Sequence, residues 1–263
     1  MKWGCTMDKQ YTIEDLLDIM EKLRGENGCP WDKVQTHESI KKSLIEESYE
    51  AIDALDSGDD KAFANELGDV LLQVVFHAQI AKERGAFDFN DCLNEICTKL
   101  ISRHTHVFGN DKAADVEESL KVWEKNKKKE KGLNTYTDAL KDVPHYLPAL
   151  MRAEKVQKKA SAAGFDWKDI SGAAEKIKEE TDELLEAGKT QNQEHIEEEL
   201  GDLLFSVVNT ARFLDVTPET ALTKSINKFI KRFEKVENNV AEIGKDIKEM
   251  SIEELDKIWE KVK

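Results

Sequence analysis

The stretch ANELGDVLLQVVFHA (residues 64–78) has a near copy in EEELGDLLFSVVNTA (residues 197–211). Each copy places two carboxylates three residues apart around a glycine, in a run that is otherwise apolar on almost every side. Residues three apart lie on one face of a helix. The same helical periodicity recurs along the chain, which contains only 4 prolines. The sequence therefore predicts an all-α fold.

The two copies belong to a longer internal duplication. Four acids of the first half recur 133 positions later: Glu47, Glu50, Glu66 and Asp69 become Glu180, Glu183, Glu199 and Asp202. Two further pairs, Lys99/Arg103 and Trp123/Lys127, recur as Lys228/Arg232 and Trp259/Lys263. A repeat of this length is typical of paired domains rather than of a solenoid.

The duplication predicts two tandem, related modules that resemble four-helix bundles. They cover residues 1–131 and 146–263, joined by a linker over 132–145 that contains Pro144. The first module is expected to form helices over residues 11–25, 36–56, 60–84 and 89–104, with a shorter one over 116–130. The second module repeats this order from residue 150.

Charge and hydropathy exclude several classes of protein. Among 263 residues, 54 are acidic and 39 basic, so the formal net charge is −15, and such a surface repels nucleic acid and anionic membrane. No apolar run approaches the roughly 20 residues of a membrane span, and the first residues lack the apolar core of a signal peptide. A cytoplasmic protein is expected, with partners that are neither nucleic acid nor membrane.

The paired acids predict a metal centre in each module. Two antiparallel helices joined by the tight turn at 57–60 would bring Glu47 and Glu50 close to Glu66 and Asp69. Like charges in a low dielectric repel one another, and a divalent cation relieves that repulsion. Carboxylate ligands without histidine or thiolate indicate Mg²⁺, with Mn²⁺ as a possible substitute. Gly68 and Gly201 are expected where another helix or a ligand approaches closely.

Other interpretations compete with the metal centre. Any single glutamate here fits a solvated helix face, but the apolar run after Asp69 leaves little room for one. A di-iron centre is excluded, because no glutamate is followed by a histidine three residues later. Lys228 and Arg232 suit phosphate binding or ordinary surface charge, and Trp259 suits stacking on a base or anchoring the last helix.

Taken together, these features resemble the MazG family of nucleoside triphosphate pyrophosphohydrolases over essentially the whole chain. The matching stretches are GCPWDKVQTHESI, LIEESYEAIDAL and ELGDVLLQVVFHA, then MRAEKVQKKASAAGFDW, IKEETDELLEA and EEELGDLLFSVVNTARFL. The resemblance implies hydrolysis of NTPs and dNTPs between the α- and β-phosphates, with Mg²⁺, by a homodimer. The rival hypothesis is a non-catalytic helical protein that dimerises or binds a partner.

The resemblance also implies roles for individual residues, with the second module favoured as the catalytic one. The implied metal ligands are Glu180, Glu183, Glu199 and Asp202, and their first-module counterparts Glu47, Glu50, Glu66 and Asp69. Glu179 and Glu180 are the implied catalytic residues, Glu179 as a base or as an outer partner of the metal. The implied nucleotide contacts are Lys176, His195, Lys228, Arg232, Trp259 and Lys263. His195 stands where a lysine is expected.

Overall fold

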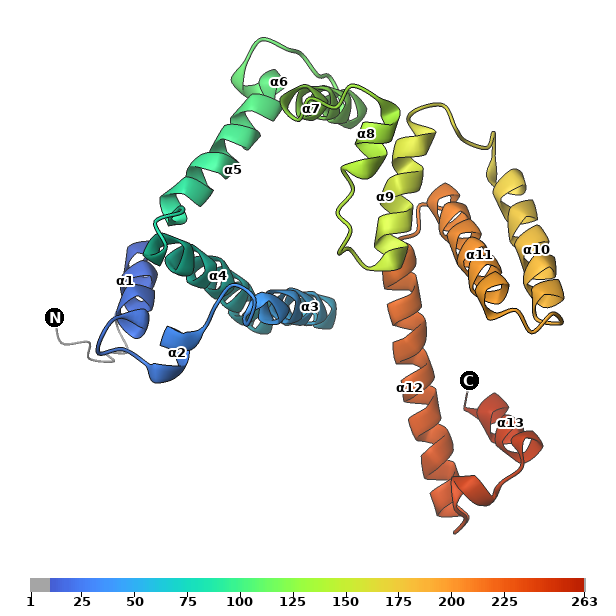
Figure 1. The fold of residues 1–263 in the computed structure, drawn as a ribbon. Helices are drawn as coiled ribbons and strands as arrows, with labels where there is room; N and C mark the ends of the chain where they lie inside the picture. The colour runs from blue at the N-terminus through green and yellow to red at the C-terminus, as the bar shows by residue number, and fades with distance from the viewer. Residues whose placement is uncertain (1–9, 263) are drawn as a thin grey trace. The chain divides into compact units, whose positions relative to one another are not determined.

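A computed structural model describes residues 10–262, and all regular structure in this range is helical (Figure 1). The predicted all-α fold class is confirmed. Within the described range, no helix combines the length and the apolar composition that crossing a bilayer requires. The chain divides into two compact units, Met1–Lys127 and Lys128–Lys263.

The first unit follows the predicted helices closely. Its elements are α1 (Ile13–Arg24), α2 (Pro30–Val34), α3 (Lys41–Ser57), α4 (Asp60–Glu83), α5 (Phe89–Arg103), α6 (Thr105–Phe108) and α7 (Val116–Glu130), which runs on into the second unit. The short helix α2 was not expected, and α3 begins later than residue 36. Thr36 and Ser39 hold the intervening turn, because each hydroxyl accepts a hydrogen bond from the other residue's backbone N–H.

The second unit repeats the order of the main helices. Its elements are α8 (Tyr136–Lys141), α9 (Ala149–Ser161), α10 (Ile170–Ala187), α11 (Gln193–Phe213), α12 (Pro218–Glu242), η1 (Ile247–Glu249) and α13 (Ile252–Lys261). Helix α8 lies within the predicted linker, where Ala139 is buried and the helix packs against α9. The linker boundaries 132–145 stay a prediction.

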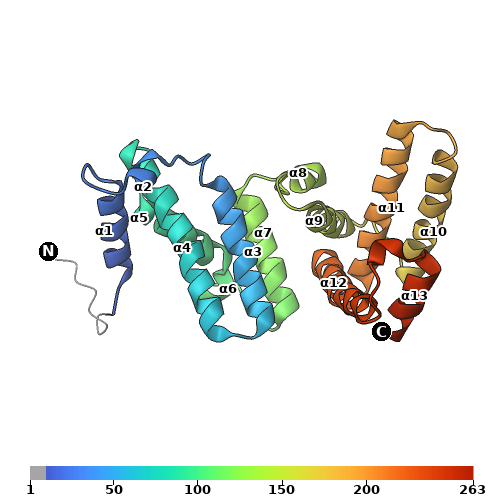
Figure 2. The same cartoon turned by 90° about the horizontal axis from the view of Figure 1, so that it is seen from below.

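A helical hairpin forms the centre of each unit. Helices α3 and α4 lie side by side in the first unit, and α10 and α11 in the second (Figures 1 and 2). In the first hairpin, Gly58 ends α3 in the left-handed region (φ 74°), and Asp59 then caps α4 by accepting from the N–H groups of Lys61 and Ala62. This two-residue connection sets how the two helices face each other.

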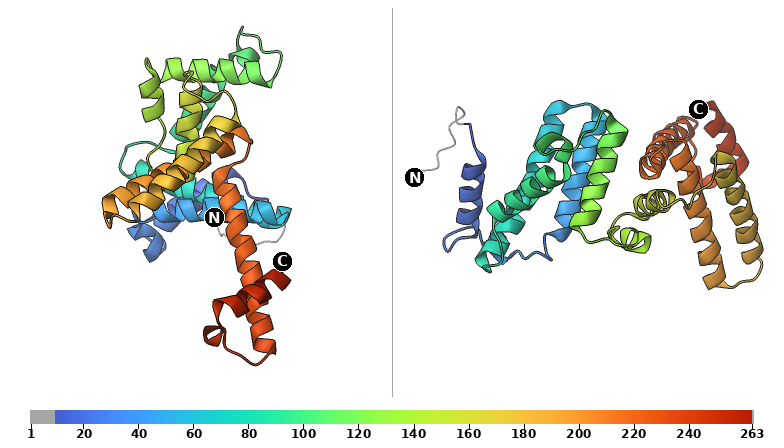
Figure 3. Two further views of the ribbon diagram at one scale, coloured as in Figure 1. Left: turned by 90° about the vertical axis from the view of Figure 1, so that its right-hand side faces the viewer. Right: turned by 90° about the horizontal axis from the view of Figure 1, so that it is seen from above.

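A second hairpin appears in the second unit, with a longer connection over residues 188–192 (Figure 3). Asn192 caps α11 through the N–H of His195, while Gln191 adopts a left-handed conformation with φ 57°. At the start of α10, Asp169 accepts from the N–H of Ser171. The polar turn residues therefore determine where the helices begin.

The apolar core of the first unit lies where α1 crosses α4. Met20, Val75, Phe76 and Ile80 are buried there together with Ile40 from the turn before α3. Arg24 is attached to the same region, with a side chain only 5% exposed. It donates two hydrogen bonds to Glu83, at 2.8 and 2.7 Å, and its guanidinium lies over the ring of Phe76. This charge-assisted pair fixes the end of α1 on the end of α4.

A pair of histidines joins the turn before α3 to α4. The Nδ1 atoms of His37 and His77 lie 2.8 Å apart, and the two rings are stacked with an interplanar angle of 6°. One imidazole must donate and the other accept, so the contact requires at least one neutral ring. Burial first, and then the neighbouring His37, lower the pKa of His77.

This pair predicts a pH-dependent stability. Because the pKa of His77 is lower in the folded chain than in the unfolded one, the unfolded chain binds the proton first on acidification. Stability is fully present above about pH 6.5 and falls as the pH drops below it, by at most ~1.4 kcal/mol per pH unit for one group. Thermal unfolding between pH 5 and 8 should show a smaller pH slope for His77→Gln than for the wild type. His145→Gln, outside this contact, should keep the wild-type slope.

Candidate metal centre

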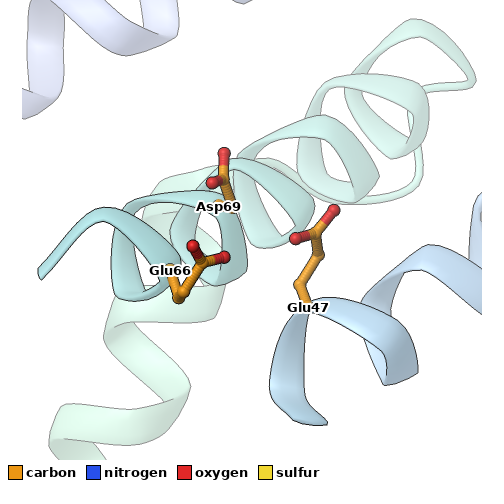
Figure 4. Close-up of side chains that lie close together, drawn as sticks. All are labelled: Glu47, Glu66 and Asp69. Atoms are coloured by element: carbon orange, nitrogen blue, oxygen red, sulfur yellow. The ribbon is translucent and has the colours of Figure 1, made fainter. Parts of the chain in front are cut away.

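The hairpin of the first unit brings three carboxylates together. Glu47 extends from α3 toward Glu66 and Asp69, which lie one turn apart on α4 (Figure 4). One oxygen from each of the three lies within 4.8 Å of the others, and all three side chains are partly buried. Three hard oxygen ligands at this separation suit a divalent cation such as Mg²⁺.

The second hairpin builds the corresponding triad from Glu180 on α10 and from Glu199 and Asp202 on α11. The same 4.8 Å limit holds, and Glu180 is only 5% exposed. Each triad thus takes one acid from the first helix of its hairpin and two from the second. The sequence predicted this meeting of acidic pairs across the hairpin, although the function of the acids as ligands stays a prediction.

Glu50 and Glu183 lie beside the triads rather than within them. Burial first, and then the charges of Asp69, Glu50 and Glu66, raise the pKa of Glu47, against a hydrogen bond from Gln73. Similarly, the pKa of Glu183 is raised by burial and by Glu180 and Glu199. Repulsion of this kind is the chemistry expected of an acidic cluster that a cation neutralises.

Lys176 provides a positive charge at the second triad. Its Nζ lies 2.7 Å from Glu180 and 2.8 Å from Glu179, and these two bonds raise the pKa of the lysine. His195 lies close as well, with Nδ1 3.4 Å from an oxygen of Glu199. Of the predicted nucleotide contacts, Lys176 thus joins the two predicted catalytic glutamates, and His195 lies beside another member of the triad.

The remaining predicted nucleotide contacts form a separate basic site on α12 and α13. Lys228 and Arg232 line a cavity of about 500 Å³, and Arg232 stacks 4.2 Å over the ring of Trp259. Among the described residues, no ion pair joins this site to the triad. Lys263 lies outside the described residues.

Sequence reasoning missed part of this basic site. Lys224, Lys231 and Lys235 line the same cavity as Lys228 and Arg232. Together with Lys228, these lysines follow one another at spacings of four, three and four residues along α12, which puts them on one helix face. The sequence contains this signal. The first unit repeats the aromatic element, because Arg103 and Lys127 both lie over the ring of Trp123.

The expectation that another helix approaches Gly68 and Gly201 is wrong, whereas the approach of a ligand stays a prediction. A Cβ built on Gly68 or on Gly201 would meet no atom within 4 Å. No other helix of the described chain therefore packs against these two glycines. Close approach does occur at Gly172, where a Cβ would lie 2.7 Å from the ring of Trp167. The side chain of Trp167 therefore rests directly on the first turn of α10.

Comparison with known proteins agrees with this arrangement. A model of the MazG nucleotide pyrophosphohydrolase domain matches residues 35–108 and again residues 170–237. Each match contains one hairpin and its triad. The chain belongs to the MazG family. The predicted family and the tandem repetition of its module are thereby confirmed.

Individual MazG relatives match over nearly the whole chain. The nucleoside triphosphate pyrophosphohydrolase/pyrophosphatase MazG of Thermotoga maritima is 50% identical over 251 residues, which are 95% of either chain. The nucleoside triphosphate pyrophosphohydrolase of Escherichia coli K12 is 44% identical over 95% of this chain and 97% of its own. The uncharacterized protein YabN of Bacillus subtilis is 46% identical over 93% of this chain and 50% of its own.

The repulsion in the first MazG triad leads to a prediction for Glu47→Gln. The pKa of Glu47 is raised in the folded chain, so its protonated form is favoured and stability is lost as the pH rises through that pKa. Without metal at pH 7.5, Glu47→Gln should therefore unfold at a higher temperature than the wild type, and near pH 4 the difference should disappear. Thermal melts in EDTA across this pH range measure both effects.

Adding Mg²⁺ at pH 7.5 should reverse the order of the unfolding temperatures, so that the wild type unfolds at a higher temperature than Glu47→Gln. A ligand at 100 times its dissociation constant contributes ~2.7 kcal/mol to the wild type, and Glu47→Gln should gain less because its first triad lacks one charged ligand. Glu38→Gln, at an exposed site before α3, is the matched control and should behave as the wild type does. Equal Mg²⁺ shifts for Glu47→Gln and the wild type would argue against a cation at the first triad.

Proposed function

We propose that the chain is a Mg²⁺-dependent nucleoside triphosphate pyrophosphohydrolase that cleaves NTPs and dNTPs between the α- and β-phosphates, releasing a monophosphate and pyrophosphate. The observation that carries this proposal is the triad of Glu180, Glu199 and Asp202, with Lys176 and His195 beside it. Two relatives that match over nearly their whole length, from Thermotoga maritima and Escherichia coli K12, are named as pyrophosphohydrolases. Their names support the same reaction.

The residues of the second hairpin would have different roles in the reaction. Glu180, Glu199 and Asp202 would hold Mg²⁺, with Glu183 as a neighbouring carboxylate. The ion would supply charge neutralisation for the phosphates and would make an attacking water more acidic. Lys176 forms an ion pair with Glu180. If Glu180 held a cation instead, the ammonium group of Lys176 would be available to bind a phosphate oxygen. Glu179 is the more exposed of the two lysine partners, and it would accept the proton of the attacking water.

The second unit is the better candidate for hydrolysis. Lys176 and His195 correspond, 133 positions earlier, to Ser43 and Ala62. The first triad therefore lacks basic side chains at these two positions, although the exposed Lys42 pairs with the neighbouring Glu46 at 2.6 Å. A triphosphate carries several negative charges, and basic side chains in contact with the triad bind and orient it. We assign a metal-binding role without hydrolysis to the first unit.

We further propose that the protein is a homodimer. Large apolar side chains are exposed on the second unit, with Leu200 and Leu204 on α11 at 45% and 49%, and Phe229 and Phe233 on α12 at 55% and 42%. Apolar surface of this extent marks an interaction face. A second copy would cover it, and the open space beside Gly201 lies on the same helix as Leu200 and Leu204.

Product analysis tests the reaction. Purified protein incubated with a panel of NTPs and dNTPs should yield monophosphate and pyrophosphate by anion-exchange chromatography, and EDTA should abolish the reaction. Diphosphate with orthophosphate would show that a different bond is cleaved. Absence of turnover for every nucleotide would favour the rival hypothesis of a dimerising or partner-binding protein.

Matched variants test which unit is catalytic. Glu199→Gln in the second triad should lower kcat by about 100-fold or more, because a ligand that organises the reacting phosphates loses its charge. Glu66→Gln changes the corresponding residue of the first triad and should leave kcat within about twofold. The opposite pattern would assign catalysis to the first unit.

A further inference from the structure

The lysines of α12 form a row on one face of the helix. They follow one another at spacings of four, three and four residues, which brings them to the same side. The members of this lysine row are Lys224, Lys228, Lys231 and Lys235. Together with Arg232 they line the cavity of about 500 Å³, and no acidic residue is among the described residues that line it. Positive charge is therefore concentrated in this cavity.

The lysine row has no carboxylate partner in the part of the chain that the structure describes. Elsewhere, exposed lysines pair with an acid four positions away, as Lys121 does with Glu117 and Lys158 with Glu154. No such ion pair reaches the row, although the chain carries 54 acidic residues against 39 basic ones. Like charges gathered in one cavity repel one another, and a bound anion removes that repulsion.

Arg232 contributes a fixed set of N–H donors to the same cavity. Its guanidinium stacks 4.2 Å over the ring of Trp259, and one terminal nitrogen donates to the carbonyl of Trp259 at 3.3 Å. Its Nε is buried and has no acceptor among the described residues. A buried donor without an acceptor is unfavourable, and a guanidinium binds the oxygens of phosphate well. The arginine therefore lacks an oxyanion that the described protein groups do not supply.

The lysine row extends beyond the residues that a triphosphate is expected to contact. Only Lys228 and Arg232 of this cavity are implied as nucleotide contacts, and they lie one helical turn apart. Lys224 lies one turn before this pair, and Lys235 lies about one turn after it. At a rise of ~1.5 Å per residue, the whole row is ~16 Å long. Contact with every member of the row requires a ligand that carries negative charge along this length.

The first unit provides an internal comparison without this row. Lys99 corresponds to Lys228 in the duplication, and the same offset places four residues opposite the lysine row: Glu95, Lys99, Ser102 and His106. The one lysine among them pairs with Glu95 at 3.3 Å. The fold that both units share therefore does not require an unpaired row of lysines, and the second unit has this feature for another reason.

From these observations we infer that the basic cavity of the second unit binds a linear chain of condensed phosphates longer than a triphosphate. Lys224, Lys231 and Lys235 are the contacts for the additional phosphates. Negative charges repeat along such a chain as the lysines repeat along α12, and the chain is narrow enough to follow one helix face. The formal net charge of −15 disfavours a bulky polyanion such as nucleic acid. The inference goes beyond the proposed function, which requires a triphosphate only.

Titration calorimetry with inorganic phosphate chains tests the inference without requiring turnover. In EDTA at pH 7.5, linear hexapolyphosphate should bind the full chain at least tenfold more tightly than tripolyphosphate. The double variant Lys224→Gln/Lys235→Gln should reduce this preference at least fivefold and change the affinity for tripolyphosphate much less. The matched control, Lys168→Gln/Lys248→Gln, removes two exposed lysines of the same unit outside the cavity and should bind both chains as the wild type does.

Nucleotides distinguish the two sources of such a phosphate chain. If the ligand is the tail of a nucleotide, adenosine tetraphosphate should bind more tightly than hexapolyphosphate; if it is free polyphosphate, the order should be the opposite. Equal affinities for tripolyphosphate and hexapolyphosphate, or an unchanged preference in the Lys224→Gln/Lys235→Gln variant, would overturn the inference. A single-stranded RNA of equal charge that binds as tightly as hexapolyphosphate would do so as well. Hexapolyphosphate binding without NTP hydrolysis would instead contradict the proposed reaction and leave this inference supported.

Discussion

Each unit depends on one physical constraint. The packing of its hairpin brings carboxylates close together, and these carboxylates repel one another. The hairpin buries apolar side chains between its helices, and the same register brings one acid of the first helix against two of the second, within 4.8 Å. Nothing in the apolar packing offsets this repulsion. A cation, an amide or an ammonium group has to offset the repulsion. This requirement accounts for the groups that surround each triad.

The two units meet the constraint with different side chains. In the first, the amide of Gln73 is hydrogen-bonded to Glu47, whose pKa nevertheless stays raised. In the second, Ser206 occupies the place of Gln73, and Lys176 pairs instead with Glu180. The hydrogen bond from Gln73 lowers the pKa of Glu47, but burial and the neighbouring carboxylates outweigh it. The two triads thus differ in the group that lies next to the first acid of each hairpin, an amide in the first unit and an ammonium in the second.

Much of this arrangement could be predicted from the sequence, because it depends on local periodicity and on a repeated spacing. The helices, their caps and the meeting of Glu47 with Glu66 and Asp69 all follow from residues close together in the chain. What could not be predicted depends on the three-dimensional surroundings. The open space beside Gly68 is an example, because the sequence shows that a glycine is present but not whether another residue packs against it. The cavity that Asn209 lines in the second unit is another, since its walls come from segments that lie far apart in the chain.

The duplication explains how one fold can supply both a stable unit and an open site. Arg24 fixes α1 to the end of α4 through Glu83 and covers Phe76, so the place between these helices is closed by protein atoms. In the second unit, Arg212 pairs with Asp166 of the segment after α9, and Asn209, which corresponds to Phe76, lines a cavity of about 330 Å³. Filling a cavity stabilises a domain, whereas leaving it open costs stability and allows a ligand to enter. A chain that carries the module twice can keep the filled version in one unit and the open version in the other.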